Sequence, residues 1–114
     1  MAIEKVNPII LTDNDSGKKY TLDFDRATVK RVEKNGFSLP DCERFPSLYE
    51  DLFYYAFLKN HEREISRKRA DELLESIGGV ADAPEGFFPR LVDLYVQTFK
   101  TLDDSKNGRV TIEL

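Results

Sequence analysis

The stretch YTLDFDRATVKRVEKNGFSL, from Tyr20 to Leu39, changes its hydrophobic period part-way along, and this change limits what the chain can form. Up to Phe24, apolar and polar residues alternate, which is the pattern of a strand with one buried face. Beyond Phe24 the apolar residues recur at helical spacing, at Ala27, Val29 and Val32. A strand followed at once by an amphipathic helix predicts a domain that combines both kinds of element.

Polar and glycine residues mark the two ends of this first helix. Asp25 is expected to be the N-cap, because its carboxylate can accept hydrogen bonds from the main-chain N–H groups of the first turn. The helix should stop at Gly36, since glycine readily takes the left-handed conformation that follows a last turn. Phe37 would then fold back onto Val32, which is the hydrophobic contact of a Schellman ending.

Two apolar runs flank a turn-rich segment ahead of this helix. The first run covers residues 8–11 and the second covers residues 19–24. Residues 13–18, between them, are rich in Asp, Asn, Ser and Gly, which favour turns. We therefore predict that the two runs pair as an antiparallel β-hairpin.

Two further helices are predicted after a proline-containing loop at residues 38–44. The second helix opens at Phe45 and Pro46, since proline is tolerated in a first turn, and reaches about Asn60. The third is capped by Ser66 and continues through residue 77, with apolar residues at i, i+3, i+4 and i+7 on one face. A pair of glycines directly after it indicates where it ends.

The start of a fourth helix can be placed in two ways. Asp82 and Glu85 could form a capping box, but Pro89 would then lie in the helix interior. The helix is therefore either kinked at Pro89 or regular only from about Phe87. From residue 91 to residue 102 it should be continuous.

These elements predict an α+β fold, with an N-terminal β-hairpin packed on a bundle of about four α-helices. A single domain is expected over residues 1–102. The tail, residues 103–114, contains an Asn-Gly turn signal followed by the alternating sequence VTIEL. It is expected to form either a short added strand or a frayed end.

Charge and cysteine content indicate the class of protein. The chain of 114 residues has a formal net charge of -4 and a pI near 5.0, and its basic residues are dispersed among acidic ones. Nucleic acid is therefore not an expected partner. Cys42 is the single cysteine, which excludes an internal disulfide and suits a reducing compartment. With neither a signal peptide nor a membrane-spanning segment in the sequence, we expect a soluble cytoplasmic protein without membrane contacts.

Candidate metal and catalytic sites fail on their spacing. The tail sequence DDSKNGRVTIEL begins like a calcium loop, but Leu114 holds the place that needs a bidentate glutamate. His61 and Cys42, each the only residue of its type, cannot assemble a zinc site. A Cys-His nucleophilic pair remains formally possible, although His61 at a polar helix end is typical of a solvated or helix-capping side chain. We expect no enzyme, no cofactor, no catalytic residue and no metal site, although a site made only of carboxylates would not be visible in the sequence.

The second and fourth helices carry more apolar surface than a single core-facing side requires. On the second helix, Phe45 and Leu52 belong to a face expected to point inward, while an opposite face is also apolar. Each helix could simply be central in the bundle, packed on all sides. The more favoured interpretation is a partner or oligomer interface. The interface candidates are Tyr54, Phe57, Leu58, Phe88, Val92, Tyr95, Val96 and Phe99.

The segments YTLDFDRATVKRVEKNGFSL, LYEDLFYYAFLKNH, ISRKRADELLESIG and FFPRLVDLYVQTF, taken in this order, resemble the tail assembly chaperones of long-tailed bacteriophages. The resemblance is to the group encoded by phages and prophages of Gram-positive bacteria, and it spans residues 20–99. It implies a non-enzymatic late protein of the host cytoplasm that binds the tape measure protein while tail tube subunits polymerise. It also implies a protein that is absent from the mature virion. Self-association into a homo-oligomer is expected from the surplus apolar faces of the second and fourth helices. The alternative is a small regulatory adaptor or antitoxin-like protein that binds one folded partner.

Overall fold

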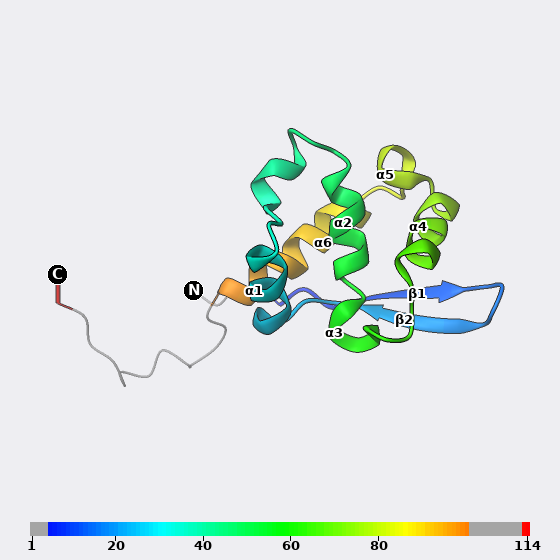
Figure 1. Ribbon diagram of the computed structural model, residues 1–114, viewed down its shortest axis with the longest axis horizontal. Helices are drawn as coiled ribbons and strands as arrows, with labels where there is room; N and C mark the ends of the chain where they lie inside the picture. The colour runs from blue at the N-terminus through cyan, green and yellow to red at the C-terminus, as the bar shows by residue number, and fades with distance from the viewer. Residues whose placement is uncertain (1–4, 101–112) are drawn as a thin grey trace.

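The structure is a computed structural model that describes residues 5–100 and 113–114. Within these residues the chain forms a two-stranded antiparallel hairpin and six α-helices (Figure 1). Helices α2, α4, α5 and α6 lie beyond β1 in this view and α3 lies beyond β2, and the core is enclosed between the helices and the hairpin. The predicted α+β class is therefore confirmed. Two of the six helices are single turns of four residues, which were not foreseen as separate elements.

The hairpin consists of β1 (Ile9–Asp13) and β2 (Lys18–Leu22). The strands pair antiparallel, with Ile9 opposite Leu22 and Asp13 opposite Lys18. The connecting turn is closed by a hydrogen bond of 2.7 Å from the N–H of Gly17 to the carbonyl oxygen of Asp13. These bounds confirm the hairpin predicted from the two apolar runs.

Helix α1 (Arg26–Lys34) begins and ends as its sequence predicts. The Oδ1 atom of Asp25 accepts a hydrogen bond of 2.7 Å from the N–H of Thr28. At the other end Gly36 has a φ of 100°, in the left-handed region. The N–H of Phe37 then donates to the carbonyl of Val32 at 3.0 Å, which is the long-range bond of a Schellman motif.

The predicted second helix is wrong as one continuous element. A 3-10 turn, η1 (Leu39–Cys42), precedes α2 (Leu48–Tyr55), and α3 (Leu58–His61) follows it separately. The break lies at Ala56, whose carbonyl accepts the N–H of Asp23 at 3.0 Å. A main-chain bond from the end of β2 thus replaces the next bond of the helical ladder, and the N–H of Phe57 bonds back to Tyr54 in a tighter turn.

Helix α4 (Arg67–Ser76) is capped as predicted, because the Oγ atom of Ser66 accepts the N–H of Arg69 at 3.1 Å. Gly78 follows it with a φ of 114°. That glycine leads directly into α5 (Gly79–Asp82), a single turn that the sequence did not reveal.

Helix α6 (Phe87–Val96) follows the second of the two starts considered. Gly86 is its N-cap, so Pro89 lies in the first turn, where its missing N–H costs no helical hydrogen bond. The expected continuous helix is wrong at its end, because the chain tightens into a 3-10 turn, η2 (Gln97–Phe99). The predictions for residues 103–112, including the strand and the calcium-loop start, fall outside the described residues.

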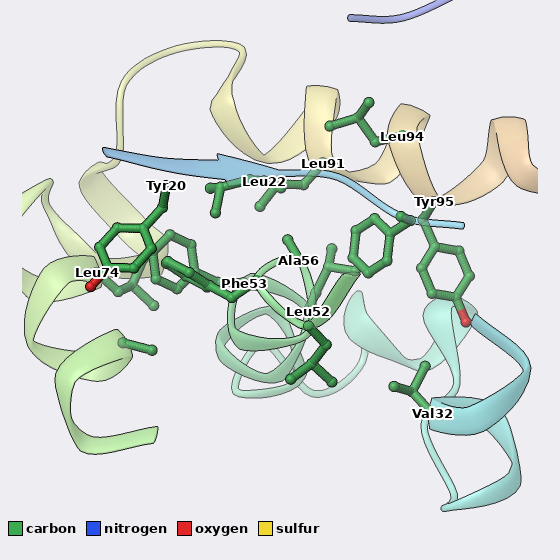
Figure 2. Close-up of a cluster of buried hydrophobic side chains, with 14 of the residues drawn as sticks. Tyr20, Leu22, Val32, Leu52, Phe53, Ala56, Leu74, Leu91, Leu94 and Tyr95 are labelled. Atoms are coloured by element: carbon green, nitrogen blue, oxygen red, sulfur yellow. The ribbon is translucent and has the colours of Figure 1, made fainter. Parts of the chain in front are cut away.

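The core is shared by the hairpin and by α1, α2, α4 and α6 (Figure 2). Leu22, Leu52, Phe53, Leu91 and Leu94 have no measurable exposure. Aromatic rings join these elements edge to face, as between Phe24 of the hairpin end and Tyr95 of α6 at 5.2 Å. Each fully buried side chain of this size contributes about 1.5 to 3 kcal/mol relative to exposure, so these contacts dominate the stability of the fold.

No helix within residues 5–100 is both long enough and apolar enough to cross a membrane.

Candidate interaction surfaces

Three of the eight interface candidates lie in the core. Phe57 is 0% exposed, Leu58 is 9% exposed and Tyr95 is 1% exposed. Their placement on a partner-facing surface is therefore wrong for the folded chain. The helix break at residue 56 redirects this segment, so that Phe57 packs edge to face on Tyr20 of β2 at 5.2 Å.

Tyr54 is partly exposed, but part of its ring is already occupied within the chain. The guanidinium of Arg67, at the start of α4, lies 5.3 Å from the centre of that ring. Arg67 also donates to Asp51 of α2 at 2.8 Å, so the cation is held over the tyrosine by an ion pair. This arrangement links α2 to α4 and leaves Tyr54 as a weak candidate for contact with another molecule.

The remaining four candidates share one side of α6 and η2. Phe88, Val92 and Val96 are partly exposed, and Phe99 is 51% exposed. Their spacing of four, four and three residues places them in a row along the helix. We call these four residues the α6 strip. At its start, the ring of Phe88 meets Tyr49 of α2 at 5.5 Å.

Phe45 was expected to face the core and does not. It is 53% exposed, because helix α2 begins only at Leu48 and Phe45 lies in the preceding loop. The helical spacing used to place its side chain therefore does not apply. Leu52, assigned to the same face, is fully buried as predicted.

His61 joins α3 to β2 and is neither solvated nor a helix cap. Its Nε2 atom accepts the main-chain N–H of Thr21 at 2.9 Å, so Nδ1 carries the proton and donates to Glu64 at 2.8 Å. Both ring nitrogens are thus used in bonds to residues other than Cys42. Burial, followed by the nearby carboxylates of Asp51 and Asp41, raises the pKa of the Cys42 thiol, which disfavours the reactive thiolate.

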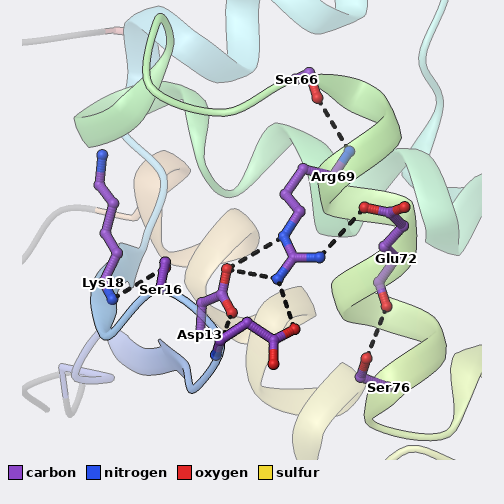
Figure 3. Close-up of polar contacts among 8 residues, drawn as sticks. Asp13, Ser16, Lys18, Ser66, Arg69, Glu72 and Ser76 are labelled. Carbon is purple, nitrogen blue, oxygen red and sulfur yellow. Dashed lines mark hydrogen bonds and ion pairs between the residues drawn. The ribbon is translucent and has the colours of Figure 1, made fainter.

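A polar cluster holds the tip of the hairpin against α4 (Figure 3). Arg69 donates to Asp13 at 2.7 Å, to Glu72 at 3.3 Å and to Asp15 at 3.4 Å. The hydrogen bond from Arg69 lowers the pKa of the Asp13 carboxyl, and the same contact raises the pKa of the guanidinium. The side chain of Asp13 is only 5% exposed, so this pair fixes the angle between hairpin and helix.

Beside this cluster lies a cleft of about 300 Å³ between the end of β1 and α4. Leu11, Thr12, Leu73 and Ile77 supply part of its wall, together with the Asp13–Arg69 pair. Sequence analysis missed both the cluster and the cleft. Asp13 and Arg69 are 56 positions apart, and no local pattern connects residues at that separation.

A family model described as a domain of unknown function, DUF5055, matches residues 1–114. The chain belongs to the DUF5055 family. Neither the curated proteins nor the solved structures gave a match to it.

The surface of this DUF5055 domain has two distinctive features. One is the α6 strip, an apolar row on a helix. The other is the β1 side of the hairpin with its adjoining cleft. Among residues 5–100, no group of three or more His, Cys, Asp or Glu side chains is placed to hold a metal ion.

Proposed function

We propose that this chain is a phage tail assembly chaperone that binds the tape measure protein and assists assembly of the tail tube. The α6 strip carries the proposal, together with the resemblance of residues 20–99 to that family. As implied by the resemblance, the protein would act in the host cytoplasm and be left out of the mature virion. No catalytic role is assigned to it.

The α6 strip has the form that a helical partner requires. An apolar row at spacings of three and four residues packs into the groove of another helix, because both helices repeat their side chains with the same period. A tape measure protein, as the family resemblance implies, is a long helical chain with apolar stripes that would aggregate if uncovered. Covering such a stripe with the α6 strip would keep it soluble.

The same strip supports the proposed self-association. Two copies could bring their α6 strips together, since an apolar row is complementary to itself across a twofold axis. Such a dimer would compete with tape measure binding for the same residues. We therefore propose that binding of the tape measure protein displaces self-contacts rather than adding to them.

Co-expression with the tape measure protein of the same phage tests the function. The wild-type chain should move the tape measure protein from the insoluble to the soluble fraction and co-purify with it. The double variant Val92→Gln, Phe99→Gln should lose this effect while remaining folded by circular dichroism. A tape measure protein that stays insoluble beside the wild-type chain would refute the proposal.

Phe45→Gln is the matched control for this experiment. Phe45 and Phe99 have nearly the same exposure, 53% and 51%, but Phe45 lies outside the α6 strip. The control should retain tape measure binding. Equal loss in the control and the double variant would show that general surface hydrophobicity, rather than the strip, is responsible. Capture of a single folded partner without any effect on the tape measure protein would favour the regulatory adaptor instead.

A further inference from the structure

The outer edge of β2 is covered by the segment that follows α2. Thr21 donates its N–H to His61, and its carbonyl accepts the side-chain amide of Asn60 at 3.3 Å. One residue beyond the strand, Asp23 donates its N–H to Ala56 at 3.0 Å. The outward main-chain groups of Thr21 and the N–H of Asp23 are therefore paired within the chain.

The outer edge of β1 is open by comparison. In the hairpin register Ile10 lies opposite Thr21, and the main chain of Thr21 points away from β1. In an antiparallel pair the main chain of Ile10 must then point away from β2, and so must that of Thr12 two residues later. Within the described residues, no bond outside the hairpin reaches the N–H or carbonyl of either residue.

This edge has few of the features that usually prevent strand addition, and Pro8 is one that it does have. Residues 7–12 carry no charged side chain, whereas exposed edges are commonly protected by lysine or by an inward-pointing charge. Ile10 is 59% exposed on the outer face. Pro8, the next residue with the same outward orientation, has no N–H and limits the open edge to residues 9–13.

The cleft adjoins this edge. Figure 1 shows α4 on the β1 side of the hairpin and α3 on the β2 side. Thr12, from the open edge, lines the cleft of about 300 Å³, and Leu73 and Ile77 of α4 line it from the other side. A strand added along Ile10 and Thr12 would thus pass beside this cleft, with the side chains near Thr12 closest to its apolar wall and the Asp13–Arg69 pair bordering its end.

The negative charge at the end of the cleft favours a bound segment with a basic residue. Asp13, Asp15 and Glu72 place three carboxylates around the one guanidinium of Arg69. The side chain of Asp15 is 89% exposed, so its charge is available to a molecule in the cleft. An added strand with a basic residue near the hairpin tip would complement this excess of negative charge.

We propose that β1 binds an extended segment of a partner protein as a third strand of the sheet. The segment has apolar residues at alternate positions and a basic residue beside Asp15. Main-chain hydrogen bonds to Ile10 and Thr12 provide affinity, while the cleft and its carboxylates provide specificity. The α6 strip takes no part in this site, so the proposal stands apart from the tail assembly function.

Binding of defined peptides tests the site. The first probe is a short blocked peptide of alternating valine and threonine with an arginine at each end, and the second has glutamate in place of arginine. Fluorescence anisotropy should show the arginine peptide binding at least about tenfold more tightly. Hydrogen exchange of the complex should show new protection at the amides of Ile10 and Thr12. Absence of binding up to about 1 mM peptide, or protection confined to α6, would overturn the proposal.

Proline substitutions on the two strands provide the matched comparison. Thr12→Pro removes an outward N–H from β1 and should weaken binding at least about tenfold, because the ladder to β2 does not use that group. Lys19→Pro makes the same change at the cross-strand partner of Thr12, because the N–H of Lys19 points away from β1, toward the outer edge of β2. It should bind as wild type does. Equal weakening by both variants would contradict the assignment of the edge.

Two further measurements distinguish other occupants. Asp15→Lys should weaken the arginine peptide and strengthen the glutamate peptide, whereas Glu85→Lys, an exposed acidic position outside the cleft, should leave both unchanged. Light scattering should show the same oligomeric state for the wild-type chain and for Thr12→Pro. A wild-type dimer that becomes monomeric in Thr12→Pro is not expected. Such a dimer would mean that a second copy occupies the edge and would overturn the assignment to a partner peptide.

Discussion

Arg69 donates from both Nε and Nη2 to a single oxygen of Asp13, Oδ2, at 3.2 and 2.7 Å. The contact joins the tip of the hairpin to the first turn of α4. The other oxygen of Asp13 accepts the N–H of Asp15 at 3.0 Å, so the carboxylate also fixes the turn. One buried acid therefore organises both the hairpin loop and the wall of the cleft.

This pairing makes stability depend on pH at the acid end of the scale. The hydrogen bond from Arg69 lowers the pKa of Asp13 in the folded chain below its ordinary value of 3.8. The Asp13–Arg69 pair therefore stabilises the fold fully at pH values above the ordinary pKa of the carboxyl. This stabilisation is lost as the pH falls through the lower pKa that Asp13 has in the folded chain. We expect the midpoint of urea unfolding to decrease below about pH 4, with a smaller pH dependence in Asp13→Asn. Identical slopes for the two proteins in that range would contradict the assignment.

A second prediction concerns the contact between His61 and Thr21. His61→Phe keeps a ring beside Tyr20, where the centroids are 5.1 Å apart, but removes the acceptor of the Thr21 N–H. The unpaired amide should destabilise the fold by about 1 to 3 kcal/mol in urea denaturation. Asn60→Ala, which removes an exposed donor to the carbonyl of the same residue, should cost less than about 0.5 kcal/mol. Equal losses of stability in the two variants would show that the hydrogen bond from Thr21 to His61 contributes no more than the one from Asn60 to Thr21.

Features set by neighbouring residues could be predicted from the sequence, and features set by distant ones could not. The Asp25 cap and the Schellman ending at Gly36 depend on side chains and dihedral preferences within a few positions. The hairpin could be predicted equally well, because its two strands and the turn between them are contiguous in the sequence. By contrast, the interruption after α2 depends on the bond between Asp23 and Ala56, which no periodicity reveals.

The candidate surface was predictable to a similar extent. Helical spacing found the α6 strip, because Phe88, Val92, Val96 and Phe99 lie on one nearly regular helix. It misplaced Phe57 because one uninterrupted helix was assumed across the break. The open edge of β1 could not be found in this way, since it depends on which main-chain groups the other edge uses.

A third prediction compares two serines at helix starts. Ser66 accepts the N–H of Arg69 and caps α4, whereas Ser47 precedes α2 and makes no such bond. Ser66→Ala should lower the free energy of unfolding by about 1 kcal/mol, and Ser47→Ala should have little effect. Chemical denaturation of both variants provides the measurement. If Ser47→Ala lost more free energy of unfolding than Ser66→Ala, the hydrogen bond of the N-cap would not explain the effects of the two substitutions.

The last prediction tests whether Phe57 belongs to the core. Its side chain is fully buried between Tyr20 and Phe53, at ring distances of 5.2 Å from each. Phe57→Gln would place an amide without partners among aromatic rings and should cost several kcal/mol, a large share of the roughly 5 to 15 kcal/mol typical of a domain. Thermal melting followed by circular dichroism should therefore show a strongly reduced midpoint.

Two core substitutions provide the scale for that measurement. Leu52→Ala and Leu73→Ala should each destabilise by about 2 to 5 kcal/mol, because the side chains are 0% and 6% exposed and leave cavities behind. Phe57→Gln should melt at least as early as Leu52→Ala. Val92→Gln, at a partly exposed position of the α6 strip, should melt closer to wild type. If Phe57→Gln instead melted like Val92→Gln, the ring would have to be accessible, and the second helical segment would return as a candidate partner surface.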